Sequence, residues 1–182
     1  MTQRSAGPPR ERTYRDPVHD QIILDLSKEG DRLLQRLIDA REVQRLRRIR
    51  QLGMAHMAFH GAEHSRFTHS LGVMHLARRM LGRLGQFADF DPLAGLAVQT
   101  AALLHDIGHG PFSHVIENFF SEHHETWTRR VLLHPDTEVH RALAEFDPAL
   151  PQLTADAIAG ELQPAWLNRL VSSQLDADRF DY

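Results

Sequence analysis

The sequence predicts an all-α fold, a bundle of helices preceded by one short β-hairpin. Apolar residues recur at helical spacing through most of the chain, and prolines and glycines separate the periodic segments. A strand-like apolar pattern is confined to residues 14–26, which predicts the hairpin. A chain of 182 residues that is 42% hydrophobic is long and apolar enough for one domain with a sizeable core. We expect that domain over residues 14–182, after a disordered tail over residues 1–13.

End signals place the first helices. We expect a helix over residues 30–39 and a second over residues 41–51, with Asp39 as the N-cap of the second and Glu42 three residues later. The second helix ends before Gly53. The basic run within it is most simply a solvated outer face. That run consists of Arg41, Arg45, Arg47, Arg48 and Arg50.

The most apolar predicted helix covers residues 92–106. Asp91 is its expected N-cap and Pro92 its first residue, and apolar side chains surround it almost completely, so we expect it to be buried. The Asp147–Pro151 segment is interpreted as a connection between two helices. The other helices are expected at residues 66–85, 112–121, 124–133, 136–145, 154–160 and 163–174.

Composition limits the class of protein. The chain contains no cysteine, which excludes disulfides and thiolate metal sites and suits a reducing cytoplasm. A net charge of −3 argues against non-specific nucleic-acid binding. The longest mainly apolar stretch, residues 93–104, is too short to cross a bilayer. We therefore expect a soluble, cytoplasmic protein without a membrane partner. Neither a GxxxxGK loop nor a GxGxxG motif is present, so a P-loop or Rossmann enzyme is not supported.

Histidines and a carboxylate gather around one glycine-flanked bend. The adjacent pair His105 and Asp106 ends the buried helix, and an isolated His69 lies upstream. Adjacent residues on a regular helix point about 100° apart, so both can reach one ion only where the helix ends, and Gly108 and Gly110 provide a turn there. Imidazole and carboxylate ligands hold a divalent cation and leave positions open for water and phosphate oxygens. The pattern therefore indicates a metal-dependent phosphohydrolase.

The joint order of several motifs resembles the HD-domain superfamily. RFTHSLGV, then LLHDIGHGPFSH, then the terminal LDADRFDY occur in the order of its deoxynucleoside triphosphate triphosphohydrolase branch, which includes dGTPase-like enzymes. DPVH and VQRLRRIRQLG extend the likeness upstream, so it covers the chain after Tyr14. The resemblance implies an HD-domain helical bundle, one divalent metal ion (Mn, Fe, Mg, Ni or Zn), a dNTP substrate and a homo-oligomer. Relatives continue beyond the last motif, so we expect the family's C-terminal segment to be missing.

The resemblance also assigns residues to the metal and to catalysis. Water activated by the metal attacks the α-phosphorus, and deoxynucleoside and tripolyphosphate are released. Glu117 orients His124, and His114 or His124 protonates the departing 5′ oxygen. The implied metal ligands are His69, His105, Asp106 and Asp178, with Asp176 as the alternative to Asp178, and the implied catalytic residues are His109, His114, His124 and Glu117.

Further residues are assigned to nucleotides by the same resemblance. Arg66 faces the triphosphate, and Leu52 lies against C2′ of the sugar, where it disfavours a ribose hydroxyl. The implied substrate-binding residues are Arg66, Gln51, Leu52, Arg179 and Tyr182. A nucleotide effector is a second expected partner, because three residues match a regulatory guanine-nucleotide site of the family. These residues are Asp39, Gln44 and Arg47.

Other interpretations of these residues stay open. A lone His69 on an apolar helix face is more often a satisfied core residue than a ligand, and Asp176, Asp178 and Asp181 fit a solvated tail. Two other functions also remain. One is an HD phosphohydrolase acting on a monophosphate, a cyclic dinucleotide or a guanosine polyphosphate. The other is a non-catalytic nucleotide sensor.

Overall fold

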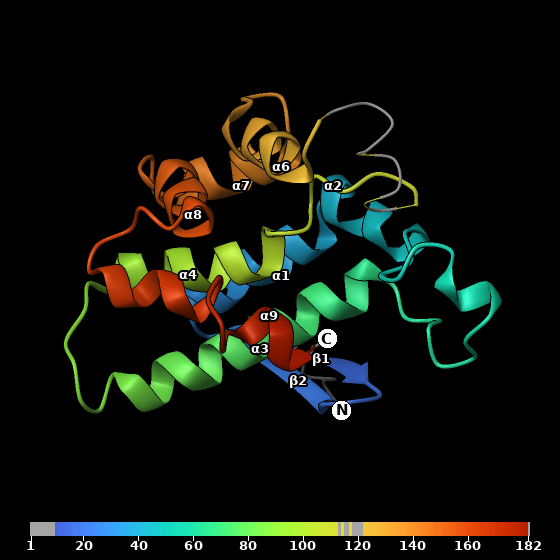
Figure 1. The fold of residues 1–182 in the computed structure, drawn as a ribbon. Helices are drawn as coiled ribbons and strands as arrows, with labels where there is room; N and C mark the ends of the chain where they lie inside the picture. Colours follow the sequence, from blue (N-terminus) through green and yellow to red (C-terminus); the bar gives the residue numbers. More distant parts are fainter. Residues whose placement is uncertain (1–9, 113, 115–116, 118–121, 182) are drawn as a thin grey trace, which may run out of the picture.

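The computed structural model describes residues 10–112, 114, 117 and 122–181. In these residues, helices pack around a central apolar helix and one two-stranded antiparallel sheet lies on the outside (Figure 1). The all-α prediction with a short N-terminal hairpin is therefore confirmed. The N-terminal elements are β1 (Glu11–Asp16), β2 (Asp20–Asp25), α1 (Glu29–Asp39), α2 (Arg41–Gln44) and two 3₁₀ helices, η1 (Arg45–Arg48) and η2 (Ala55–Met57). They are followed by α3 (Arg66–Leu84), α4 (Pro92–Leu104), α6 (His124–Leu133), α7 (Glu138–Phe146), α8 (Leu150–Ala159), η3 (Ala165–Leu170) and α9 (Ala177–Asp181).

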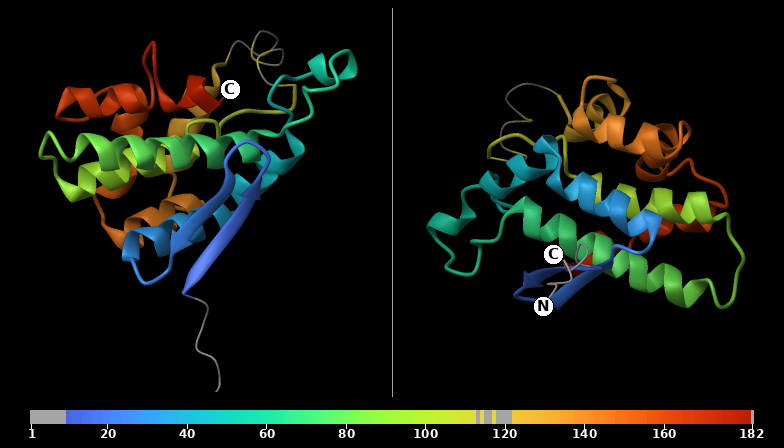
Figure 2. Two further views of the ribbon diagram at one scale, coloured as in Figure 1. Left: turned by 90° about the horizontal axis from the view of Figure 1, so that it is seen from below. Right: turned by 180° about the vertical axis from the view of Figure 1, so that it is seen from behind.

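The hairpin buries one face of β2. Ile22 and Leu24 are fully buried, whereas Ile23 between them is exposed, as expected for a strand with one face on the core. β2 packs against α1 and α3, and the hairpin lies beside α3 on the side away from α6–α8 (Figure 2). β1 begins at Glu11, so residues 11–13 are part of a strand rather than of the expected tail. Residues 1–9 lie outside the described part of the chain.

Helix α4 is the centre of the molecule. It packs against α3 on one side and α8 on the other, so that three layers lie above one another (Figure 1). The predicted N-cap is confirmed, because the Asp91 carboxylate accepts a hydrogen bond from the Leu93 amide at 3.0 Å. Most of its residues are buried, as predicted. Because α4 runs through the interior, the residues that follow Leu104 also lie there.

The predicted helix over residues 41–51 is wrong in length and in its cap. α2 ends at Gln44 and continues as the 3₁₀ helix η1 to Arg48. Its N-cap is Ala40, which makes no side-chain cap, and Asp39 is instead the last residue of α1. The chain leaves the helix because Arg50 pairs with Ser65 as an antiparallel bridge. This bridge places the start of α3 beside residues 49–51.

The C-terminal helices also differ from the expectation. α8 begins at Leu150, because Pro151 lies in its first turn and not in the connection before it. The segment expected to be helical over residues 163–174 is the 3₁₀ helix η3, and the last residues form α9, which packs on α3. Of the expected helix over residues 112–121, only Phe112, His114 and Glu117 lie within the described part. Within that part, no helix is long and apolar enough to cross a membrane.

Candidate active site

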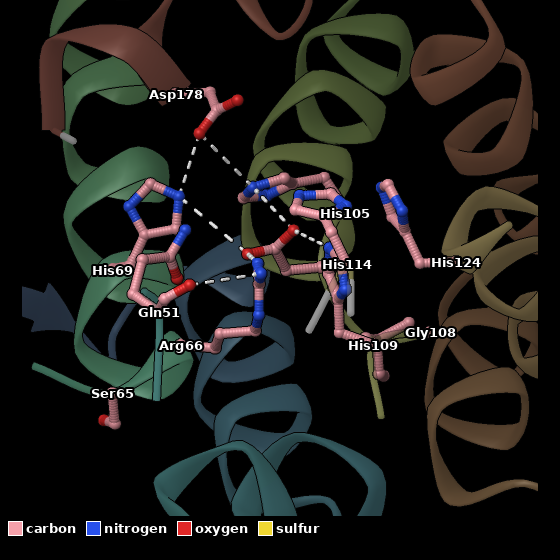
Figure 3. Close-up of polar contacts among 12 residues, drawn as sticks. Gln51, Ser65, Arg66, His69, His105, Gly108, His109, His114, His124 and Asp178 are labelled. Atoms are coloured by element: carbon pink, nitrogen blue, oxygen red, sulfur yellow. Dashed lines mark hydrogen bonds and ion pairs between the residues drawn. The ribbon is translucent and has the colours of Figure 1, made fainter. Parts of the chain in front are cut away.

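The four predicted metal ligands lie together: Asp178 faces His69 and His105 (Figure 3), and Asp106 lies against the same two histidines. His69 comes from the first half of α3, His105 and Asp106 follow the last residue of α4, and Asp178 comes from α9. His69 Nε2 lies 2.9 Å from Asp178 Oδ1 and 3.9 Å from Asp106 Oδ2. His105 Nε2 lies 3.5 Å from Asp106 Oδ1 and 3.7 Å from Asp178 Oδ1. The arrangement presents two imidazole nitrogens and two carboxylates to one small space.

Local hydrogen bonds orient these side chains. His105 Nδ1 donates to the Ala102 carbonyl at 2.9 Å, and because a carbonyl only accepts, the lone pair of a neutral ring lies on Nε2. Asp106 Oδ2 accepts a hydrogen bond from Arg66, whose guanidinium also donates to the Gln51 carbonyl at 3.4 Å. Both Asp106 and Arg66 are buried. The donor atoms are thus held in place by the protein itself.

The structure distinguishes the two candidate aspartates. Asp176 is buried, and its carboxylate accepts hydrogen bonds from the amides of Ser173 and Arg179, at the start of α9. Asp176 therefore fixes the local turn. Asp178, within α9, reaches both histidines.

Burial and charge pairing shift the pKa values of the cluster. Burial lowers the pKa of His69, but the carboxylates of Asp178 and Asp181 outweigh it and raise this pKa to about 9. Burial raises the pKa of Asp106, yet His105, His109 and Arg66 hold it well below its usual value. The pKa of Asp178 is also lowered, because His105 and His69 outweigh the effect of burial. Both carboxylates are therefore ionised at neutral pH and favour a cation beside them.

The residues present fit a divalent metal ion. His69, His105 and Asp106 each offer a ligand atom, and these atoms lie within 4.8 Å of one another. His105 Nε2 is buried and has no hydrogen-bond partner among the described residues, which is costly unless a ligand binds there. A set of imidazole nitrogens and carboxylate oxygens without thiolate suits Mn, Fe, Zn and similar cations.

A second group of histidines surrounds Glu117. Its carboxylate lies 2.9 Å from Nδ1 of His124, 3.2 Å from Nδ1 of His114 and 3.3 Å from Nδ1 of His109. The rings of His109 and His124 are stacked, with centroids 3.8 Å apart. Burial lowers the pKa of His109 to about 4, so this ring is neutral at neutral pH. The expected contact between Glu117 and His124 is present in the structure.

One cavity of about 250 Å³ joins the two groups. Arg66 and Gln51 reach it from the start of α3 and from the segment before η2, while Leu52 and Arg179 are not among its lining residues. Arg179 is exposed and donates to the Gln174 carbonyl at 3.4 Å, and Tyr182 lies outside the described residues. The cavity is lined by Gln51, Arg66, His105, Asp106, His109, His114, His124, Glu125, Ile158, Val171, Ser172 and Asp178.

The three residues expected to bind an effector lie outside this cavity. Gln44 accepts a hydrogen bond from Arg47 at 2.8 Å, and the Arg47 guanidinium stacks 3.7 Å above the Phe67 ring. Burial raises the pKa of the Tyr14 hydroxyl, and the charges of Asp39 and Arg47 both act on the same hydroxyl. The three residues therefore belong to one neighbourhood at the α1–η1 end of the molecule.

Two residues that position the site were not foreseen. Arg45 donates to the carbonyls of Ile107 and His109, so this member of the basic run is attached to the loop that follows α4. Thr128 on α6 accepts from the Gly108 amide and donates to the His105 carbonyl, both at 3.0 Å. A sequence pattern gives no signal for such contacts, because each joins segments far apart in the chain.

Comparison with known proteins identifies the family. The HD-domain profile matches residues 66–159. The chain is 46% identical over 173 residues to the uncharacterised protein YwfO of Bacillus subtilis (strain 168), which covers 94% of this chain and 39% of YwfO. It is 45% identical over 111 residues to the human deoxynucleoside triphosphate triphosphohydrolase SAMHD1, which covers 58% of this chain and 16% of SAMHD1.

A solved structure shares the fold. The crystal structure of a phosphohydrolase from Bacteroides thetaiotaomicron VPI-5482 has a TM-score of 0.79 and 34% identity, over 94% of this chain and 40% of that one. The present chain spans 39–41% of the length of the first relatives that it matches. It belongs to the HD-domain family of phosphohydrolases, whose members bind divalent metal ions.

Proposed function

We propose that this protein is a metal-dependent deoxynucleoside triphosphate triphosphohydrolase. The observation that carries the proposal is the convergence of His69, His105, Asp106 and Asp178 on one side of a cavity whose other wall holds the histidines around Glu117. The likeness to SAMHD1 supports the choice of a dNTP among phosphate-containing substrates. The reaction converts a dNTP and one water molecule into a deoxynucleoside and tripolyphosphate.

Different side chains have different roles in the proposed reaction. His69, His105, Asp106 and Asp178 would hold a divalent cation, which would supply Lewis-acid chemistry for activating water and polarising a phosphoryl oxygen. Arg66, fixed by Asp106, brings a positive charge to the cavity, where the transferring phosphoryl group gathers negative charge. His109, which burial favours in its neutral form, lies between the two groups, with Nε2 3.4 Å from Asp106 Oδ1 and Nδ1 3.3 Å from Glu117 Oε1, and so links the two carboxylates.

His124 is the proposed general acid. Its Nδ1 hydrogen bonds to Glu117 at 2.9 Å, which orients the ring and leaves Nε2 to deliver a proton to the departing 5′ oxygen. His114 is more exposed and shares the same carboxylate at 3.2 Å, so it assists from the rim of the cavity. We expect His124→Ala to lower kcat by about 10²–10⁴-fold with Mn²⁺ binding unchanged, the usual effect of losing a general acid.

Product analysis tests the proposal. Each of the four dNTPs, and GTP, is incubated with the protein and Mn²⁺, and the products are separated by anion exchange. We expect deoxynucleoside and tripolyphosphate in equal amounts, absent with the His105→Ala/Asp106→Ala variant and retained with His134→Ala, which removes an exposed histidine outside the cavity.

Other outcomes contradict the proposal in distinct ways. Release of pyrophosphate or orthophosphate from a dNTP indicates cleavage at a different phosphorus and hence another phosphohydrolase reaction. Thermal stabilisation by dNTPs without any product indicates a nucleotide sensor, because a ligand that binds the native state raises its stability. Full activity of the double variant excludes the metal-binding pair from the chemistry.

A further inference from the structure

A line of hydrogen bonds runs from His69 away from the cavity. His69 Nδ1, on the far side of the ring from the metal ligands, lies 2.8 Å from Asp181 Oδ2 on α9. The other oxygen, Asp181 Oδ1, lies 2.6 Å from His19 Nε2 in the turn between β1 and β2. The side chains of His19, Asp181 and His69 are 9%, 7% and 1% exposed. Three segments far apart in the chain thus share one buried carboxylate.

Gly72 makes the space for that carboxylate. It lies on α3, three residues after His69 and therefore on the same face of the helix. A Cβ atom at this position would lie 1.8 Å from Asp181 Oδ1, a distance that no side chain permits. Asp181 therefore occupies a notch in α3 that exists only because residue 72 is glycine.

Hydrogen bonds within the hairpin turn fix the position of His19. The Asp16 carboxylate accepts hydrogen bonds from the amides of Val18 and His19 at 2.8 and 2.9 Å, which closes the turn around His19. The His19 ring then rests against the His75 ring of α3, with centroids 5.2 Å apart. These contacts hold the His19 imidazole in the position from which it hydrogen bonds to Asp181.

We infer that His19 and Asp181 are positioning residues of the metal centre, which keep a hydrogen on Nδ1 of His69, so that Nε2, which faces Asp178 in this structure, is the nitrogen that gives up its hydrogen when the cation binds. An ionised carboxylate only accepts hydrogen bonds, so Asp181 requires a hydrogen on His69 Nδ1 and another on His19 Nε2. Metal-binding histidines commonly donate their second N–H to such a carboxylate, which sets the ring orientation and raises its basicity. The inference rests on the metal site proposed above.

This assignment gives the hairpin a role in function. His19 and Asp181 both lie outside residues 66–159, the part of the chain that the family profile matches. The metal ligand His69 is thereby attached to both ends of the described chain, to β1–β2 through His19 and to α9 through Asp181. Loss of either contact weakens metal binding without removing a ligand.

The test measures Mn²⁺ affinity rather than hydrolysis. Isothermal titration of the chelator-treated full chain with Mn²⁺ is performed for Asp181→Asn, His19→Leu and His19→Gln, and urea unfolding of each metal-free protein is measured in parallel. We expect Asp181→Asn to bind Mn²⁺ about 10–100-fold more weakly, as is typical for partners of metal-binding histidines. His19→Leu also weakens binding, whereas His19→Gln retains an N–H donor near the position of Nε2 and restores most of the affinity.

Asp31→Asn is the matched control. The Asp31 carboxylate also joins the hairpin to α3, because it accepts from the Asp25 amide at 2.7 Å and from Arg78 at 2.9 and 3.0 Å, but neither of these partners is a proposed metal ligand. We expect this variant to lower the stability of the metal-free protein and to leave Mn²⁺ affinity unchanged.

Two results overturn the inference and can be told apart. If the wild-type chain binds Mn²⁺ and the Asp181 and His19 variants bind it equally well, the contacts are structural only and the proposed function is unaffected. If the wild-type chain itself binds no Mn²⁺, the proposed metal centre fails and the positioning role fails with it.

Discussion

Two glycines set how closely the parts of the site approach each other. Gly72 admits the Asp181 carboxylate to the surface of α3, and Gly108 allows the loop after α4 to touch the first turn of α6. A Cβ at residue 108 would lie 2.1 Å from the His124 carbonyl and 2.4 Å from the Thr128 amide. Since both obstacles are backbone atoms, they cannot rotate away. Gly108 thus determines the distance between the loop after α4 and the proposed general acid.

We expect Gly108→Ala to lower the free energy of unfolding by about 1–3 kcal/mol, the usual cost of forcing an extra methyl into a packed region. Gly61→Ala is the control, because no atom lies within 4 Å of a Cβ at that position. Urea unfolding in the presence of a chelator measures both. Equal stability of the two variants would show that the loop after α4 moves freely relative to α6.

At the scale of elements, the loop that follows α4 is held from two sides. Arg45 of η1 donates to the Ile107 and His109 carbonyls, and Thr128 of α6 bonds the His105 carbonyl and the Gly108 amide. Polar backbone groups of an irregular segment need such partners when water is excluded. η1 and α6 therefore determine where the proposed metal ligands after α4 lie.

We expect Arg45→Met, which keeps the apolar stem and removes the donors, to cost about 1–3 kcal/mol of unfolding free energy, in the range for hydrogen bonds to charged groups. Arg48→Met, an exposed arginine of the same 3₁₀ helix, should change stability by less than about 0.5 kcal/mol. Thermal unfolding of both variants measures the difference. A similar small effect for both would contradict a role of Arg45 in holding the loop.

Elements with strong local signals could be predicted from the sequence, and elements decided by tertiary contacts could not. The Asp91 cap and the apolar side chains on nearly all faces of residues 92–104 are sufficient to predict α4. The predicted helix over residues 41–51 fails because the bridge between Arg50 and Ser65 competes with further helical turns. α8 was placed too late, since Pro151 fits a first helical turn as well as it fits a loop.

At the scale of the whole molecule, the candidate site is assembled from segments distant in sequence. The order of motifs was enough to nominate His69, His105 and Asp106, which the structure brings together. The choice between Asp176 and Asp178 required the direction in which α9 faces α3, which spacing alone does not give. Asp181 could have been suspected, because it lies three residues after Asp178 and so shares its helix face. His19 ends the DPVH motif, but its contact with Asp181 could not be foreseen, because the two residues are 162 positions apart.

The location of bound Mn²⁺ tests the central claim most directly. Two groups of side chains in the described residues offer metal ligands, one containing His69, His105 and Asp106 and one around Glu117. We expect an anomalous difference map from crystals grown with Mn²⁺ to show a peak about 2.0–2.3 Å from Nε2 of His69 and His105 and from oxygens of Asp106 and Asp178. A peak only among His109, His114, Glu117 and His124, or no peak in either group, would contradict the proposed metal centre.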